Sequence, residues 1–218
     1  MPYAAALSEH PLATHATGEV VGEVLERLGG TAPDLAVVFV TRPHLGALED
    51  IASSVRTMLA PGTLLAATAV SVLGGREEAE DVPAVSLWAG HTGAVRPVHL
   101  TAVDAPGGTT IAGLDPEDLD AAATLVLIAD PGSFPTEAFL ASVSASHPHL
   151  VVVGGMASAG FGPGGNRLVV DGTIVDNGAV GVLLSPDQVV TTVVSQGCEP
   201  VGAPFTVTRA ERNMVHEI

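Results

Sequence analysis

The chain has 218 residues, which is enough for one large domain or two small ones with a substantial hydrophobic core. Hydrophobic residues make up 47% of the sequence and charged residues 15%, so the composition excludes a disordered chain. The formal net charge is −16, and all eight basic residues are arginines. This acidic balance argues against nucleic acid or an anionic membrane as a partner, because both are bound through a basic face.

The cysteine content and the N-terminal segment predict the compartment. Cys198 is the only cysteine, so no intrachain disulfide can form, and a reducing compartment fits. Residues 1–20 lack the basic region and apolar run of a signal peptide. No apolar stretch reaches the roughly 18 residues that a membrane-spanning helix needs. We therefore expect a cytoplasmic protein.

The first half of the chain predicts strands that alternate with amphipathic helices. Continuous apolar runs indicate buried strands, whereas apolar residues three or four positions apart indicate helices. These patterns predict strands at residues 3–7, Leu35–Thr41 and Thr63–Ser71, and helices at Thr17–Leu28 and Leu45–Leu59.

The segments that follow predict a loop, two strands and a connector. The acidic segment REEAED, residues 76–81, is expected to be a loop. Two strands paired with each other are expected next, AVSLWAG at residues 84–90 and GAVRPVHLTAV at residues 93–103. Turn-forming residues predict a connector over residues 104–120, and Asp115 is expected to cap a short helix at its end.

The second half predicts the same order of elements. It begins with a strand, a helix bounded by proline, and a strand that enters a glycine-rich turn. A hairpin around Asp171-Gly172 and further strands are expected after it. The predicted ranges are Leu125–Ala129 (strand), Pro135–Ser146 (helix), Leu150–Gly155 (strand), Arg167–Val170 and Thr173–Val175 (hairpin), Gly178–Leu184, Val189–Ser195 and the start of a strand at Phe205–Thr208.

This recurrence predicts two internal repeats, at about residues 34–103 and 124–198. A gapless shift of 88 positions places Val37–Ser71 on Leu125–Ala159, and a shift of 95 sets DVPAVSL against DNGAVGV. Two unrelated βαβ units are the alternative. The expected fold class is α/β, of the mixed α+β kind, with two βαβ-plus-antiparallel-strand repeats that form mixed sheets with helices on their outer faces.

The first candidate site is the GGMASAG segment, residues 154–160, at the end of a predicted buried strand. Glycines there let a ligand approach the backbone closely, and ligands of α/β proteins favour the carboxyl ends of strands. Gly154, Gly155, Met156 and Ser158 are therefore candidate ligand-binding residues. A tight turn that packs against a neighbouring helix is the alternative.

Two further segments hold candidate residues. In SQGCEPVG, residues 195–202, Gln196 and Cys198 are candidate ligand contacts, and the thiol is alternatively a nucleophile, a soft metal ligand or a small buried hydrophobe. In DPGSF, residues 130–134, three roles are open to Asp130: it orients a ligand, accepts hydrogen bonds from backbone groups of the turn, or caps the next helix. The helix cap is the favoured interpretation. No cofactor is predicted. Noncovalent haem bound through one of the histidines is the alternative, since no CxxCH segment is present.

These segments, in this order, resemble the FIST family (F-box and intracellular signal transduction proteins), and specifically its N-terminal domain. The resemblance rests on VVGEVLERL, DLAVVFVT, TLLAATAVS, LVLIADPGSF, LVVVGGMASAG, DNGAVGVLL and SQGCEPVGAPFTVTRAERN. It implies a sensory domain in prokaryotic signalling that binds a small ligand, with amino acids proposed for the family. Residues 66–71, AATAVS, differ from the family's usual GCSTAG turn, which puts a ligand contact at that turn in doubt.

The resemblance also implies a division of the chain and a set of partners. Residues 1–204 are expected to form the FIST N-type domain, and residues 205–218 the start of a missing or truncated C-terminal FIST domain. Expected partners are a small molecule and either a signalling protein or that C-terminal domain. The preferred function is a non-catalytic sensory domain. The alternatives are a hydrolase or transferase that uses Cys198, and a protein-interaction module.

Overall fold

The computed structural model of the chain describes residues 2–105, 108–188, 190–193, 201–211 and 214–218. Its helices are α1 (Ala13–Arg27), the 3-10 helix η1 (Arg42–Ala47), α2 (Leu48–Leu59), α3 (Pro116–Ala121) and α4 (Thr136–Ser146). Its strands are β1 (Tyr3–Ser8), β2 (Leu35–Thr41), β3 (Thr63–Ala69), β4 (Ser71–Gly74), β5 (Glu77–Glu80), β6 (Val85–Gly90), β7 (Arg96–Ala105), β8 (Gly108–Ala112), β9 (Thr124–Ala129), β10 (Val151–Met156), β11 (Leu168–Val170), β12 (Thr173–Val175), β13 (Ala179–Leu184), β14 (Arg209–Glu211) and β15 (Met214–Glu217).

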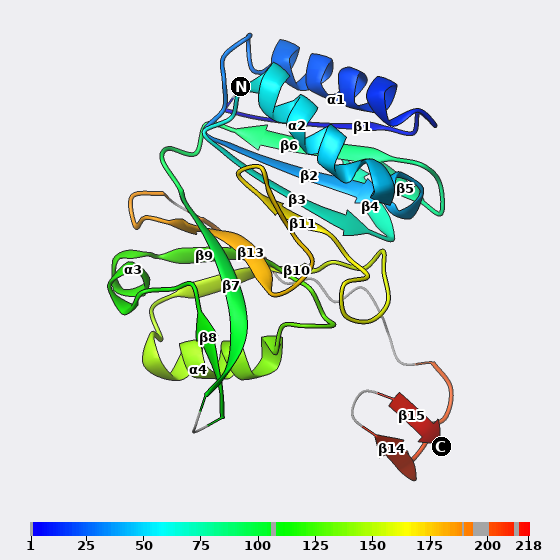
Figure 1. Cartoon of the computed structure of the whole chain (residues 1–218), viewed down its shortest axis with the longest axis vertical. Coiled ribbons are helices and arrows are strands. Elements are labelled where there is room, and N and C mark those ends of the chain that lie inside the picture. Colours follow the sequence, from blue (N-terminus) through cyan, green and yellow to red (C-terminus); the bar gives the residue numbers. More distant parts are fainter. Residues whose placement is uncertain (1, 106–107, 189, 194–200, 212–213) are drawn as a thin grey trace.

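The described elements form four layers, helix on sheet on sheet on helix (Figure 1). One sheet has the strand order β1-β6-β2-β3-β11-β12, and the second has the order β10-β9-β13-β7-β8. Helices α1 and α2 cover the outer face of the first sheet, and α3 and α4 cover that of the second. Strands β2 and β3 pair in parallel, as do β9 and β10, and the other pairs are antiparallel. The expected mixed α+β fold with outer helices is confirmed.

Apolar patterning explains why the two sheets pack face to face. On β2, residues 36, 38 and 40 contact the helices, whereas Val37 and Phe39 face the second sheet. The strands of both sheets therefore need apolar residues on both faces, and the sequence supplies continuous apolar runs. The core between the sheets consists of Leu35, Leu65, Ala67, Ile128, Ala157, Leu168, Val170, Val180, Val182 and Leu184.

The hairpin around Asp171-Gly172 ties the two halves together. It follows β10 in the chain, yet β11 pairs antiparallel with β3 of the first sheet. Asp171 has a φ of 47°, and its Oδ1 accepts a hydrogen bond from the backbone N–H of Leu64 at 2.9 Å. The Arg56 guanidinium also donates to this oxygen, at 3.2 Å. The predicted hairpin is confirmed, and it covers the outer edge of β3.

The strands at residues 84–90 and 93–103 do not pair with each other, so that prediction was wrong. Strand β6 lies between β1 and β2, which occupy both of its edges, whereas β7 pairs with β13 and β8 in the other sheet. Residues 91–95 carry the chain from one sheet to the other. Adjacency in sequence favours pairing, but a strand with two filled edges cannot accept a third partner.

Other local predictions also need correction. The acidic segment REEAED is largely strand, because Gly75, at a φ of 65°, closes a β4–β5 hairpin in which Ala79 alone is buried on β5. The predicted connector contains β8, and the side chain of Asp115 makes no capping hydrogen bond to α3. Helix α1 begins at Ala13, four residues before the expected start. Residues 190–193 and 205–208 are not strands, and residues 189, 194 and 195 lie outside the described part.

The two βαβ units correspond closely, with one difference from the gapless alignment. Leu65 pairs with Val37, and Val153 pairs with Val126. A separation of 88 positions relates Leu65 to Val153, but 89 positions separate Val37 from Val126. The gapless alignment is therefore one residue out of register along β2, which would exchange the two faces of that strand. Duplication of one ancestral unit stays a prediction.

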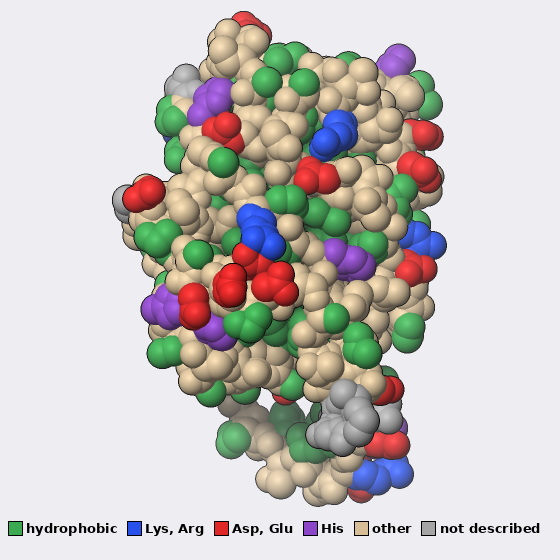
Figure 2. Space-filling model, turned by 60° about the vertical axis from the view of Figure 1, so that its left-hand side comes forward, with side chains coloured by type: hydrophobic (Ala, Val, Ile, Leu, Met, Phe, Trp, Pro, Cys, Tyr) green, Lys and Arg blue, Asp and Glu red, His purple; other side chains and the backbone are tan. Residues whose placement is uncertain are grey.

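The protein has an acidic surface and a short C-terminal pair of strands outside the two sheets. Acidic side chains outnumber basic ones on the face drawn in Figure 2, in line with the net charge. Strands β14 and β15 pair with each other and lie apart from both sheets in Figure 1. Within the described ranges, no helix is both long and apolar enough to cross a membrane.

Candidate functional site

The GGMASAG segment begins on β10, which is the end strand of the second sheet. Strand β10 pairs with β9 along one edge, and no described strand pairs with its other edge. Val151 and Met156 have exposed fractions of 44% and 59%. Gly154 and Gly155 are also exposed. The part of the segment that lies on β10 is thus an open edge of the fold rather than a buried strand, whereas Ala157 and Ala159 beyond it are buried.

The two adjacent glycines of β10 have different reasons to lack a side chain. Gly154 has a φ of 146°, and a Cβ there would overlap the carbonyl oxygen of Leu127 on β9. Gly155 pairs with Ile128, which belongs to the core between the sheets, and a Cβ at Gly155 would meet no atom within 4 Å. Gly154 is therefore required by the backbone, whereas Gly155 leaves open space between the sheets.

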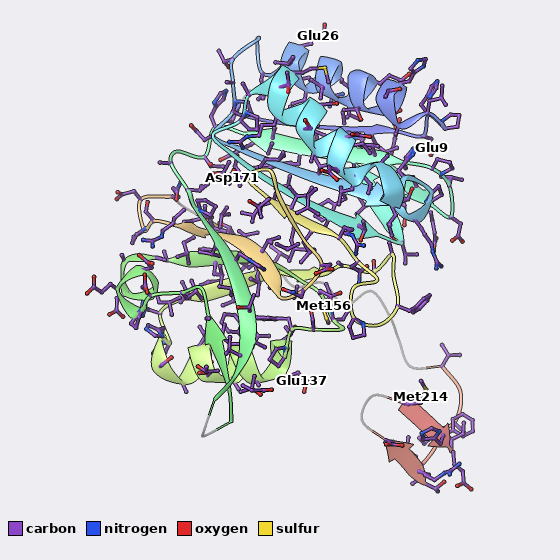
Figure 3. All side chains as sticks on the ribbon, viewed as in Figure 1. Glu9, Glu26, Glu137, Met156, Asp171 and Met214 are labelled. Atoms are coloured by element: carbon purple, nitrogen blue, oxygen red, sulfur yellow. The ribbon has the colours of Figure 1, made fainter. Side chains whose placement is uncertain are left out.

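An apolar cavity of about 460 Å³ fills this space between the two sheets. Met156 lies where the sheets meet (Figure 3). The cavity walls come from β2, β3 and β6 on one side and from β9 and β10 on the other. The lining residues are Val37, Phe39, Leu65, Ala67, Thr68, Ala69, Trp88, Val126, Ile128, Gly154, Gly155, Met156 and Ala157. No charged side chain of the described residues lines it.

A second pocket, of about 430 Å³, lies beyond the carboxyl ends of β2, β3 and β10. Its wall includes Ser158 and Val70, together with Arg42 and Asp81, whose charges are opposite. The Arg42 guanidinium lies 5.6 Å from the centre of the Phe161 ring. This pocket is the more polar of the two, and it contains one residue that the sequence predicted, Ser158.

Two hydrogen bonds of Ser158 lie between the inter-sheet cavity and the polar pocket. The Ser158 N–H donates to the Thr68 carbonyl at 3.1 Å, and the Ser158 Oγ accepts from the Val70 N–H at 3.0 Å. These bonds join the end of β3 to the turn after β10. The Ser158 side chain thus holds the turn in place and contributes to the wall of the polar pocket.

Asp130 is fully buried, and both oxygens of its carboxylate accept hydrogen bonds from other side chains. Its Oδ1 accepts from Asn166 Nδ2 at 3.0 Å, and its Oδ2 accepts from Ser133 Oγ at 2.6 Å. Helix α4 instead has Pro135 at its N-cap, so the favoured interpretation of Asp130 as a helix cap was wrong. Asp130 does not line either hollow at the GGMASAG segment.

Asn166 extends this buried network to the first sheet. Its Oδ1 accepts from the Gly160 N–H at 2.8 Å and from Thr68 Oγ1 at 3.3 Å. Thr68 Oγ1 also accepts from the Arg167 N–H at 3.2 Å. Every buried side-chain nitrogen and oxygen in the described ranges has a hydrogen-bond partner, so the network is closed and forms a rigid floor beside the cavity.

The remaining predicted residues, Gln196 and Cys198, lie outside the described residues. The structure brings together Gly154, Gly155 and Met156 on the cavity wall and places Ser158 next to it. Sequence reasoning missed Asn166, which closes the buried network, and the cavity residues Phe39 and Trp88. The alternation of β2 between two apolar faces was the signal that pointed to an inward position for Phe39.

A serine, a histidine and an aspartate lie in a row at the end of α4, away from the cavity. The Nδ1 of His147 is 2.8 Å from Ser146 Oγ, and its Nε2 is 3.6 Å from Asp120 Oδ1. The Ser146 hydroxyl, however, donates to the Ser142 carbonyl at 2.8 Å. The hydroxyl thus has the helix backbone as an acceptor besides the imidazole, whereas nucleophilic catalysis would require its proton to pass to the imidazole.

The described side chains do not suit a metal ion, and those of the inter-sheet cavity do not suit haem. Within the described ranges, no three residues of the His, Cys, Asp and Glu types are grouped to hold a metal. No described histidine lines the inter-sheet cavity, and His44, which is buried, already contacts the His10 carbonyl through Nε2 at 3.1 Å. Haem also carries two propionates, and no arginine of the described residues lines this cavity. The described lining therefore does not fit haem.

These features define a four-layer sandwich domain with an open edge and a cavity between its sheets. The family model described as the FIST N domain matches residues 34–218, and the chain belongs to the FIST family.

Similar proteins are found in mycobacteria. The chain is 35% identical over 208 residues to an uncharacterized protein of Mycobacterium bovis, a match that covers 95% of this chain and 53% of the relative. It is 33% identical over 212 residues to an uncharacterized protein of Mycobacterium tuberculosis, which covers 97% of this chain and 55% of the relative. The chain thus spans about half the length of these curated relatives.

Proposed function

We propose that this chain is a non-catalytic sensory domain that binds a small molecule between its two sheets. The observation that carries this proposal is the cavity of about 460 Å³ next to the open β10 edge. Its volume falls within the roughly 300–1,000 Å³ typical of small-molecule sites. Ligands of α/β proteins gather at the carboxyl ends of parallel strands, and the cavity lies near those ends of β2, β3 and β10.

The lining supports binding over catalysis. Acid–base and nucleophilic chemistry need an ionisable or nucleophilic group within reach of the reacting atoms. Apart from the threonine hydroxyl of Thr68, which is already hydrogen-bonded, the described lining consists of apolar side chains and glycines. A site of this kind recognises shape and apolar surface.

Signal output requires a partner, which we propose to be a signalling protein or a C-terminal FIST domain. The curated relatives are about twice as long as the part matched here, which leaves room for a second domain in them. The open β10 edge lies beside the cavity. Ligand binding there would change the surface offered to such a partner.

A screen of thermal unfolding tests the proposal. A ligand that binds only the folded state raises the melting temperature by mass action. The fluorescence of Trp88, the only tryptophan in the chain, reports directly on the cavity that it lines. We expect at least one class of small molecule to raise the melting temperature and to change Trp88 fluorescence together. A broad panel that changes neither property would contradict the proposal.

The open edge of β10 also favours a second candidate function, a protein-interaction module. An unpaired strand edge can accept a strand from another chain. This function predicts that a partner protein slows hydrogen exchange along residues 151–156 in the absence of any small molecule. The two functions are therefore separated by whether the edge responds to a small molecule alone.

A further inference from the structure

The chemistry of the cavity restricts what it can hold. Its described lining has hydrocarbon, aromatic and thioether surface from residues such as Phe39, Trp88 and Met156, and no ionisable side chain. We infer that the ligand is an uncharged, largely apolar molecule rather than a free amino acid or another zwitterion. This inference rests on the proposed function, because it names the ligand class of the same site.

The desolvation of charge is the first argument. A carboxylate or ammonium group transferred from water into an apolar space is strongly disfavoured unless an opposite charge or several hydrogen bonds receive it. The nearest carboxylate of the network, on Asp130, is fully engaged by Asn166 and Ser133. Neither charged group of a zwitterion would find an oppositely charged side chain among the described cavity walls.

The closed hydrogen-bond network is the second argument. Thr68 contributes to the wall, but its hydroxyl donates to Asn166 and accepts from the Arg167 N–H. No buried side-chain polar atom in the described ranges is left without a partner. Sites that recognise polar ligands keep donors and acceptors aimed at the ligand. Here the Thr68 hydroxyl is already hydrogen-bonded, and the side-chain surface that lines the cavity is almost entirely carbon and sulfur.

The volume gives the size of the ligand. An engineered apolar cavity of about 150 Å³ in another protein stays dry and takes up benzene, so a space about three times larger suits on the order of 15 non-hydrogen atoms. The neighbouring polar pocket with Arg42 and Asp81 lies beyond the Ser158 bridge and shares no lining residue with the cavity. The ionisable groups of Arg42 and Asp81 therefore belong to a separate lining.

Gly155 provides a variant that fills the cavity without straining the backbone. A side chain there would enter the inter-sheet face beside Ile128, with no atom within 4 Å of its Cβ. Gly155→Leu removes ligand volume, and Gly155→Val is a smaller change if the leucine variant is unstable. Gly22→Leu is the matched control, because Gly22 lies on the exposed side of α1 and a Cβ there also meets no atom within 4 Å.

The test uses N-phenyl-1-naphthylamine, a neutral aromatic amine of suitable size whose fluorescence rises in apolar surroundings. The full chain is expected to bind it saturably at one site, with a matching loss of Trp88 emission by energy transfer. Gly155→Leu should weaken binding about tenfold or more, since overfilling a packed site is costly, and Gly22→Leu should leave it unchanged. Equal binding by the wild type and Gly155→Leu would overturn the inference.

Free leucine and phenylalanine separate this inference from the proposed function. If they alter Trp88 fluorescence, and Gly155→Leu abolishes that effect while the neutral amine does not bind, the site exists but its ligand class is wrong. If neither the amine nor any amino acid alters Trp88 emission, the proposed function fails as well. Apolar binding that amino acids do not displace is the expected result.

Discussion

Strands β3 and β10 hold equivalent places in the two sheets, yet they differ sharply in burial. Each is the second strand of a parallel βαβ unit and pairs with the first. Strand β3 is buried over nearly its whole length and receives β11 on its outer edge, whereas β10 is mostly exposed. The same topology therefore produces a structural strand in one half and an open edge next to a cavity in the other.

Sequence differences between the strands account for this contrast. Where β3 has TLLAATA, β10 has VVVGGM, so the leucine-and-alanine surface that packs on both faces of β3 gives way to a glycine pair. The hairpin that covers β3 comes from the second half of the chain. The corresponding hairpin of the first half, β4–β5, pairs only with itself among the described strands. The glycine pair of β10 and the different placement of the two hairpins therefore both contribute to the contrast.

The largest expected effect comes from truncating equivalent apolar residues on the two strands. Leu65 and Val153 occupy matching positions on the faces toward the other sheet, but Leu65 is fully buried and Val153 is half-buried. Leu65→Ala should lower the free energy of unfolding by about 3 kcal/mol, and Val153→Ala by about 1 kcal/mol or less. Urea denaturation measures both. Equal losses would show that β10 is as well packed as β3.

Removal of the Asp130 carboxylate should have the next largest effect. Asp130→Ala leaves Asn166 and Ser133 without a buried acceptor, so we expect a loss of about 2.5 kcal/mol of stability. Binding of the neutral amine to the protein that remains folded should be unchanged, because Asp130 does not line the cavity. A variant of normal stability that binds no ligand would instead assign Asp130 to the site.

The two glycines of β10 should respond differently to the same change. Gly154→Ala adds a Cβ that overlaps the Leu127 carbonyl at a positive φ, so about 2 kcal/mol of stability should be lost. Gly155→Ala meets open space, and its effect should stay within about 0.5 kcal/mol. Thermal unfolding of the pair checks this. Similar melting temperatures would refute the assigned backbone requirement at Gly154.

A smaller effect is expected where the hairpin is attached to the covered edge. Asp171→Ala removes the acceptor for the Leu64 N–H and the half-exposed contact with Arg56, which should cost about 1.5 kcal/mol. Hydrogen exchange at residues 63–69 should become faster, while exchange at residues 151–156 stays the same. Faster exchange in both strands would mean that the hairpin does not protect β3 selectively.

The sequence predicted local elements better than it predicted their partners. The predicted bounds of strand β2 agree with the structure. Its seven apolar or β-branched residues form a run of strand length, and such a run between turn-forming residues is typical of a buried strand. The placement of β6 and β7 in different sheets depends on contacts between distant segments, which no local pattern records. The same limit applies to the site. The adjacent glycines pointed to β10 as a candidate site. The hydrogen bond between Asp130 and Asn166 joins residues 36 positions apart, so only the folded structure reveals it.

Amide hydrogen exchange of β3 and β10, measured with and without N-phenyl-1-naphthylamine, tests whether β10 is an open edge beside a ligand-binding cavity. Residues 151–156 should exchange faster than residues 63–69 in the free protein, because no described strand pairs with the outer edge of β10. The ligand should slow exchange at β10 most strongly. Equal protection of the two strands in the free protein, or ligand-dependent slowing confined to segments away from the cavity, would contradict this description of β10.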